Sequence, residues 1–325
     1  MSIEKLIDLM NNKVGLPSKY DKAKKQFIIQ TAQQRHIFKS EMIGNIDKSN
    51  IVAIIQYMKH LDDPSILITS HINNVLAEKL QKANIQYIDF SGNMFINEPP
   101  VFISIKGEAP QKLPTLETKS FALSTASIKI IYTLLAVENA ITLTYRDIAK
   151  MSDVALGSVG KTFLMLQQNG YLIEKLQNEK SLVNKKNLFT KWCIGYNEKL
   201  RPKLVIDKFG ADNLELLKKV NPADFHLLWG GEMGAAILTH YLKPQIITLY
   251  ADNELPTLQL KCRLKRDPNG NIELLKKFWN FDTKTDQQHV APFILIYADL
   301  LSAFDERNQE TADIIYDKYI KETME

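Results

Sequence analysis

Apolar residues in the first part of the chain alternate between the spacing of helices and that of strands. Three runs have the spacing of an amphipathic helix: IEKLIDLM, NIVAIIQYMKHL and HINNVLAEKLQKA. Four others are strand-like and are separated by Pro64 and by the SGN and NEPP turns: SILIT, IQYIDF, MFI and VFISIKG. This alternation predicts a small α/β domain over residues 1–107.

The next stretch, GEAPQKLPTLETKS, has two prolines, several charges and little apolar content. It predicts a linker over residues 108–120. From about Arg201 onward, helical patterns are mixed with LQLKCRLKRD and NIELLKKFW. These two runs flank PNG, a strong turn signal, and predict a β-hairpin.

Three helical segments follow the linker. Residues 124–138 place their larger apolar side chains on one face, as a helix in a three-helix core would: Ile128, Ile131, Leu134 and Leu135. The second segment, TYRDIAKM, opens with Thr144 and has Asp147 three residues later, which is a helix-capping signal. The third, ALGSVGKTFLMLQQNG, ends at Gly170, a natural helix stop.

The third segment carries small and polar residues where a DNA-reading helix would meet the groove. Its predicted inward stripe is Val159, Phe163 and Leu166. The residues predicted to lie off that stripe are Leu156, Gly157, Ser158, Gly160, Lys161, Thr162 and Met165. Gly157 and Gly160 let the backbone approach a phosphate, where the helix dipole also favours an anion. We expect Ser158, Lys161 and Thr162 to approach the major groove.

A polar turn, QNEK, joins YLIEKL to SLVNKK and predicts a two-stranded wing after the third helix. Its predicted phosphate contacts are Lys175, Lys180, Lys185 and Lys186, which would add affinity but little sequence information. Three helices and a hairpin can be packing alone, and lysines at a turn can be a solvated edge. The ordered combination favours a winged helix-turn-helix that binds DNA through these lysines and through Leu156, Gly157, Ser158, Gly160, Lys161 and Thr162.

The predicted fold class is therefore a multidomain α+β protein. It has an N-terminal α/β domain (1–107), a linker (108–120), a central winged helix-turn-helix (121–195) and a C-terminal α/β domain (196–325). Because DNA-site symmetry mirrors protein symmetry, we expect a homodimer or a pair of monomers on double-stranded DNA.

Composition narrows the protein class without identifying it. The chain of 325 residues is 45% hydrophobic and has no apolar run of membrane-spanning length and no signal-peptide pattern, so we expect a cytoplasmic protein. Cys193 and Cys262 stand far apart without partners at metal-ligand spacing, and we predict neither metal nor cofactor. The formal net charge of +4 is compatible with a phosphate-bearing partner but too small to establish one.

A metal-dependent nuclease is the strongest enzymatic alternative. Glu41 and Asp89 lie on or beside strands of the first domain, as carboxylates that converge on a cation would. However, the acid-x-lysine pattern is missing after Glu41, and Lys106 stands alone. We therefore expect Asp89 to form a tight turn with Gly92 and Asn93, and we predict that the chain is not an enzyme.

Residues 229–234, WGGEMG, form a glycine cluster between a strand-like and a helical run. Phosphate-binding loops use glycines in such places, but neither the dinucleotide fingerprint nor the P-loop spacing is present. A closely packed start of a helix, capped near Glu232, fits better. The histidines are scattered, which gives no catalytic constellation. The run from Tyr297 to Tyr316 is expected to be one amphipathic helix with surface ion pairs.

Several longer segments resemble the AbiEi-type antitoxins, which are transcriptional regulators of type IV toxin–antitoxin systems in abortive infection. They are NIQYIDFSGNMFI with VFISIKG, FTKWCIGYNEKLRPKL, LLWGGEMGAAILTHYLKPQIITLY, FW, and APFILIYADLLSAFDERNQETADIIYDKYI. The resemblance implies a repressor that binds inverted repeats in its own promoter. It also implies an antitoxin that opposes a nucleotidyltransferase-like toxin without a stable complex. A winged-helix scaffold that binds only protein remains an alternative.

Overall fold

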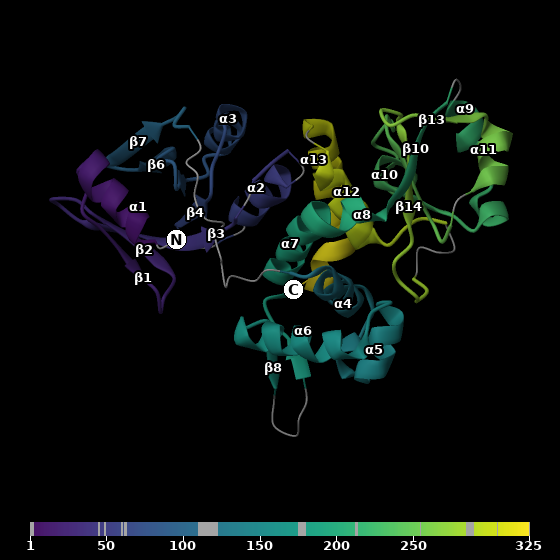
Figure 1. Ribbon diagram of the computed structural model, residues 1–325, viewed down its shortest axis with the longest axis horizontal. Helices are drawn as coiled ribbons and strands as arrows, with labels where there is room; N and C mark the ends of the chain where they lie inside the picture. The colour runs from purple at the N-terminus through teal and green to yellow at the C-terminus, as the bar shows by residue number, and fades with distance from the viewer. Residues whose placement is uncertain are drawn as a thin grey trace. The chain divides into compact units, whose positions relative to one another are not determined.

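A computed structural model describes residues 3–44, 46–48, 50–59, 61, 64–109, 123–174, 180–211, 214–253, 255–283, 289–303 and 305–324. The chain divides into two compact units, unit 1 (Met1–Ala122) and unit 2 (Leu123–Glu325), drawn in Figure 1. Most of the predicted linker, from residue 110 onward, lies outside the described residues.

Unit 1 is built on one seven-stranded sheet with helices. Its elements are α1 (Glu4–Leu9), β1 (Ser18–Asp21), β2 (Gln26–Gln30), β3 (Arg35–Met42), α2 (Ile51–Lys59), β4 (Ser65–Thr69), α3 (Asn74–Lys82), β5 (Tyr87–Asp89), β6 (Met94–Glu98) and β7 (Val101–Ile105). The three predicted helices and the four predicted strands are confirmed. β1, β2 and β3 were not among the predicted strands, because charged residues and glutamines interrupt their apolar pattern.

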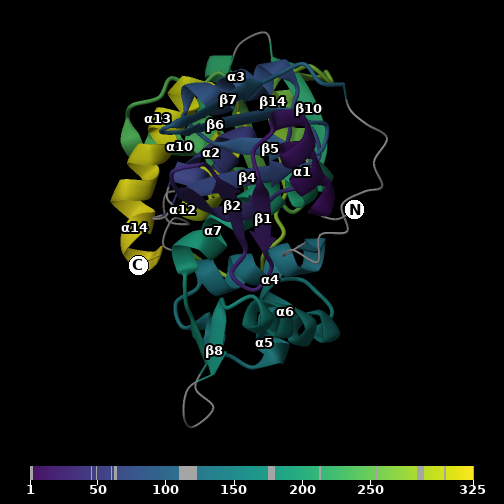
Figure 2. The same ribbon diagram turned by 90° about the vertical axis from the view of Figure 1, so that its left-hand side faces the viewer.

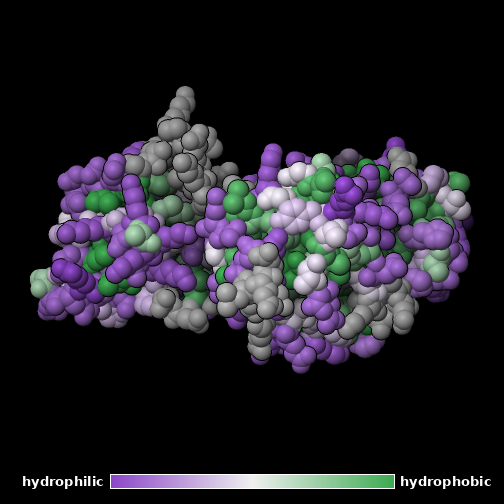
Figure 3. Space-filling view, turned by 90° about the horizontal axis from the view of Figure 1, so that it is seen from below, coloured by the Kyte–Doolittle hydropathy of each residue, from purple (hydrophilic) through white to green (hydrophobic). Residues whose placement is uncertain are grey.

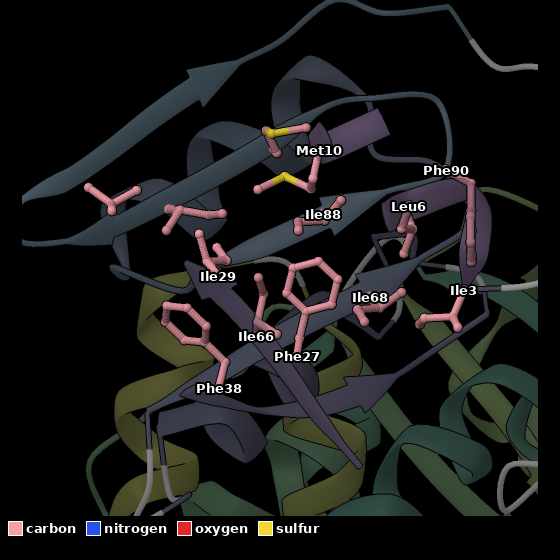
Figure 4. Packing of buried hydrophobic residues seen from close by; sticks show 13 residues of the cluster. Ile3, Leu6, Met10, Phe27, Ile29, Phe38, Ile66, Ile68, Ile88 and Phe90 are labelled. Carbon is pink, nitrogen blue, oxygen red and sulfur yellow. The ribbon is translucent and has the colours of Figure 1, made fainter. Parts of the chain in front are cut away.

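The strands of unit 1 follow one another in chain order across the sheet. β3, β4 and β5 are parallel, and the remaining neighbours are antiparallel. Figure 4 shows the apolar core on one face of the sheet, where Leu6 and Met10 lie with Phe27, Phe38 and other side chains of the strands. The α/β character predicted for this region is therefore correct.

Unit 2 begins with helices and a two-stranded sheet. These are α4 (Thr125–Ala136), α5 (Tyr145–Met151), α6 (Leu156–Gln168), β8 (Leu172–Glu174), β9 (Lys180–Leu182) and α7 (Lys185–Gly195). A π-helical turn, η4 (Tyr196–Leu200), and α8 (Arg201–Leu204) continue directly from α7. The predicted division of this unit at residue 195 stays a prediction, and it falls inside that continuous helical run.

A five-stranded sheet and its helices complete unit 2. The elements are β10 (Val205–Ala211), α9 (Leu214–Lys218), β11 (Leu228–Gly230), α10 (Gly231–Thr239), β12 (Ile247–Ala251), α11 (Pro256–Cys262), β13 (Leu264–Arg266), β14 (Ile272–Lys276), α12 (Phe293–Ser302), α13 (Glu306–Ile315), η7 (Tyr316–Ile320) and α14 (Lys321–Met324). The expected single helix over 297–316 is wrong, since α12 ends at Ser302 and α13 starts at Glu306.

The predicted hairpin between β13 and β14 is also wrong. The strand order is β11-β12-β14-β10-β13, so β10 lies between the two strands and pairs with both. Phe209 of β10 is opposite Arg266 on one side and Ile272 on the other. The PNG turn is present between β13 and β14, but these two strands are not adjacent in the sheet because β10 lies between them.

Asp299 of α12 is a fully buried carboxylate at the centre of unit 2. Its Oδ1 accepts hydrogen bonds from Tyr196 Oη (3.1 Å) and Arg201 Nε (2.9 Å). Its Oδ2 accepts from Tyr250 Oη (2.9 Å) and from the Gly231 backbone N–H (3.3 Å). The surface ion pairs expected on the helix that includes Asp299 do not describe this residue, whose ion pair with Arg201 is buried.

Burial raises the pKa of Tyr196 and Tyr250 well above the usual phenol value, and the nearby Asp299 raises both further. Both phenols therefore stay protonated and can donate to the carboxylate. Arg201 also pairs with Glu273 of β14, with 2.7 Å between Nη2 and Oε2. The network thus joins helices and strands that are far apart in the sequence, with a separation of 103 positions between Tyr196 and Asp299.

We expect Asp299→Ala to destabilise unit 2 by about 3–5 kcal/mol, because it leaves the buried Arg201 guanidinium without its main partner. The measurement is urea unfolding followed by tryptophan fluorescence, since all three tryptophans, Trp192, Trp229 and Trp279, lie in unit 2. Glu215→Ala, which removes an exposed ion pair with Lys218, is the control and should leave the midpoint unchanged. Equal midpoints for the two variants would contradict this role of Asp299.

Candidate nucleic-acid interface

The helices α4, α5 and α6 pack together around a small apolar core, and Figure 2 shows them beside β8. Ile128 and Ile131 of α4, Ile148 of α5 and Val159 of α6 are fully buried. The inward residues predicted for α4 and α6 are therefore confirmed. α6 follows α5 after a short turn, which is the order of helices in a helix-turn-helix.

Polar contacts fix the ends of these helices. Thr144 Oγ1 accepts from the Asp147 backbone N–H (3.2 Å) and donates to Asp147 Oδ2 (2.6 Å), so the predicted cap of α5 is confirmed. In the turn before α6, the hydroxyls of Ser152 and Thr133 lie 2.7 Å apart and tie the turn to α4. Lys129 Nζ donates to Asp153 Oδ2 (3.1 Å) in the same turn. The start of α6 is thereby held against α4.

The outward side of α6 is a single strip of exposed residues. Gly157, Lys161, Leu164 and Gln168 recur at intervals of four, three and four positions, which places them on one side of a helix, and all four are exposed. A side chain at Gly157 would meet no atom within 4 Å. Leu164 is 55% exposed although it is large and apolar. The prediction included Gly157 and Lys161 and missed the other two, which the same spacing could have found.

The other predicted α6 residues are distributed around this strip. Leu156 is 48% exposed, and Ser158 and Gly160 are partly buried. The placement of Thr162 off the inward stripe is wrong, because the residue is only 1% exposed. Its hydroxyl donates to the Ser158 carbonyl (2.8 Å), which satisfies the polar group inside the core. Thr162 follows Val159 by three positions and so belongs to the buried face.

The lysines predicted for the wing have different positions. Lys180 lies on β9 with its Nζ 5.0 Å from the centre of the Tyr145 ring, a cation–π distance. Lys185 and Lys186 belong to the first turn of α7, so their placement in the wing is wrong. Lys185 Nζ donates to the Thr323 carbonyl (2.8 Å). Lys175 lies outside the described residues.

Two further cations, which were not among the predicted DNA contacts, lie on α5. Arg146 and Lys150 are both exposed. In helix-turn-helix proteins, the first helix of the motif crosses the DNA backbone, where cations neutralise phosphates. Their position in TYRDIAKM, the first helix of the predicted motif, was a signal that could have identified them.

Asp89 forms the tight turn predicted for it. Its Oδ1 accepts from the backbone N–H groups of Ser91 (2.8 Å), Gly92 (2.8 Å) and Asn93 (2.9 Å). Its Oδ2 accepts from the Ile72 N–H (2.8 Å) and the Asn93 side chain (2.7 Å). The carboxylate thus organises the loop. Across the described residues, no group of three or more His, Cys, Asp or Glu side chains is arranged to hold a metal ion.

The glycine cluster at residues 230–234 is a site of close packing, as predicted. A Cβ at Gly230 would lie 2.5 Å from the Tyr250 ring, and one at Gly234 would lie 2.8 Å from the Trp229 carbonyl oxygen. Gly231 has a positive φ of 47°. The expected helix cap by Glu232 is wrong, because its buried carboxylate accepts from the Gln245 N–H (2.6 Å) and from Asn308 Nδ2 (2.9 Å) instead.

Comparison with known protein families adds a match to the second half of the chain. Residues 181–321 match the family described as transcriptional regulators, AbiEi antitoxins of type IV toxin–antitoxin systems. The predicted family resemblance is confirmed over this segment. The AbiEi match begins in β9 and includes the Asp299 network and the glycine cluster, whereas α4, α5 and α6 precede it.

No curated protein and no solved structure matches the chain. Within the described residues, every helix is too short or too polar to cross a membrane. The AbiEi match is therefore the comparison that bears on function, and it describes a regulatory class of protein.

The two kinds of glycine should respond oppositely to substitution. Gly230→Ala forces a methyl group into the Tyr250 ring, and we expect it to destabilise unit 2 by about 1–3 kcal/mol or more. Gly157→Ala has open space and removes a helix-disfavouring residue, so stability should be unchanged or rise by up to about 1 kcal/mol. Urea unfolding monitored by tryptophan fluorescence compares them. Destabilisation by Gly157→Ala would show that the outward side of α6 is packed.

Proposed function

We propose that the chain is a DNA-binding transcriptional repressor in which α4, α5, α6 and the β8–β9 sheet form a winged helix-turn-helix. The observation that carries this proposal is the outward side of α6, which is exposed, begins with a glycine and holds a lysine. An α-helix fits the major groove of DNA when small or polar residues face the bases. The regulatory character of the AbiEi match supports the same conclusion.

In this proposal, the strip on α6 reads base edges. Lys161 is suited to the acceptor atoms of guanine, Gln168 to adenine, and Leu164 to the methyl group of thymine. Gly157 allows the start of α6 to come close to a phosphate, which the helix dipole favours. Arg146 and Lys150 of α5 and Lys180 of β9 would contact the backbone on either side.

The biological role proposed for the chain follows its AbiEi resemblance. The chain would repress its own operon by binding inverted repeats, as a homodimer or as paired monomers, in the cytoplasm. It would also act as the antitoxin to a nucleotidyltransferase-like toxin, without forming a stable complex with it. The Asp299 network and its surroundings lie in the matched segment, so the antitoxin activity is assigned to that part of the chain.

Lys161→Glu should weaken binding to the intergenic DNA upstream of the chain's own gene by at least about tenfold, because it replaces an attractive charge at the groove by a repulsive one. Fluorescence anisotropy at fixed salt measures the affinity. Lys82→Glu, which makes the same charge change at an exposed position of α3, is the matched control and should have little effect. Equal affinities for both variants would exclude α6 as the DNA-reading helix.

A further inference from the structure

A second cationic surface lies at one end of the sheet in unit 1. Between Ser18 and Met42, six basic residues stand against two acidic ones, Asp21 and Glu41. The basic residues, named here the basic hairpin surface, are Lys19, Lys22, Lys24, Lys25, Arg35 and Lys39. All are exposed except Lys39, which is partly buried. This excess of four positive charges equals the formal net charge of the whole chain, +4.

The strand register brings part of this surface onto one face of β1, β2 and β3. Lys19 is opposite Ile28, and Ile28 is opposite Ile37. In the neighbouring rows, Gln26 is opposite Lys39 and Gln30 is opposite Arg35. Because side chains alternate between the two faces of a strand, these residues share the face opposite the core residues Phe27, Ile29 and Phe38. Ile37 is 47% exposed, so this end of the face is open.

The tip of the β1–β2 hairpin holds three of the lysines in a fixed turn. Asp21 Oδ1 accepts from the backbone N–H groups of Ala23 and Lys24, each at 3.0 Å. The Lys25 carbonyl accepts from the Ser40 backbone N–H (2.9 Å) and hydroxyl (2.8 Å), which ties the tip to β3. Lys22, Lys24 and Lys25 form no ion pair within the described part of the chain. The backbone is therefore ordered while the charges remain exposed.

The chemistry of this surface fits a phosphate backbone better than a protein. Lysine is depleted in the centre of protein interfaces, where aromatic and apolar anchors are enriched, whereas phosphates are contacted by lysine, arginine and glutamine. The side of unit 1 seen at the left of Figure 3 is mainly hydrophilic, with separate hydrophobic groups between the hydrophilic residues.

We propose that the basic hairpin surface of unit 1 is a second, sequence-independent contact to duplex DNA, made to the phosphate backbone. The inference rests on the proposed function, because the same duplex would be read by α6 of unit 2. When one of two linked surfaces has bound a duplex, binding of the other surface to the same duplex is intramolecular, and this raises the overall affinity. In this proposal, unit 1 adds electrostatic affinity for DNA, and unit 2 recognises the base sequence.

The test compares two triple variants of the full chain. One replaces Lys22, Lys24 and Lys25 by glutamine at the hairpin tip. The matched control replaces Lys48, Lys59 and Lys82, three exposed lysines elsewhere in unit 1, and therefore changes the net charge equally. Each is titrated by fluorescence anisotropy onto the upstream intergenic DNA and onto an unrelated duplex of the same length, at several salt concentrations.

The hairpin variant should reduce the slope of log affinity against log salt by about 2 to 3, since each lost phosphate contact removes about 0.9. The reduction should be the same on both duplexes, and the preference between them should be unchanged. The control should keep the slope of the unaltered chain. Equal slopes for the two triple variants overturn the hairpin contact and leave the α6 proposal standing. Absence of DNA binding by the unaltered chain overturns both proposals.

Discussion

The buried charge of Asp299 is the constraint on which the arrangement of unit 2 depends. A carboxylate in an apolar interior is tolerated only when donors surround it, and those donors come from η4, α8, β12 and the start of α10. Gly230 and Gly231 leave room for the side chains that pack around this carboxylate. A side chain at Gly230 would collide with Tyr250, which donates to the carboxylate, and one at Gly231 would collide with Thr248. These glycines therefore allow close packing around a buried carboxylate.

A continuous series of contacts links this network to the DNA-reading helices of the proposal. Tyr196, which donates to Asp299, stacks on Trp192 with 5.2 Å between ring centres. Trp192 Nε1 donates to the Ile128 carbonyl of α4 (2.9 Å), and its ring also stacks on Tyr132 at 5.6 Å. Because α4 packs on α6, the outward strip of α6 is presented from the same rigid core that holds Asp299. The segment matched by the AbiEi family and the proposed DNA-reading helices are therefore packed on the same aromatic core around Trp192.

The sequence predicted the parts of this structure that depend on local periodicity. The spacing of Ile128, Ile131 and Val159 predicted their burial, and Thr144 with Asp147 predicted a cap that is present. Residue type alone gave wrong predictions of burial for polar side chains that have partners inside the protein. Thr162 was assigned to the surface because of its hydroxyl, yet the hydroxyl bonds within its own helix. Asp299 lay in a run that was predicted to be an amphipathic helix with surface ion pairs, and its buried partners could not be inferred since they lie about fifty to a hundred residues away in the chain. The position of β10 between β13 and β14 likewise depends on pairing between segments that are distant in the sequence.

The distribution of charge is the link between the proposed DNA-reading helix and the proposed second contact. The outward strip of α6 carries one cation, Lys161, beside an apolar and an amide side chain, a composition suited to discriminating bases. Affinity for DNA comes largely from neutralised phosphates, and one lysine on the reading helix supplies little of it. The lysines of the β1–β2 hairpin offer further positive charge on unit 1, in a turn that is held by hydrogen bonds to Asp21 and from Ser40. In the two proposals together, α6 of unit 2 reads the sequence, Arg146, Lys150 and Lys180 of the same unit contact phosphates, and unit 1 adds phosphate contacts that do not depend on sequence.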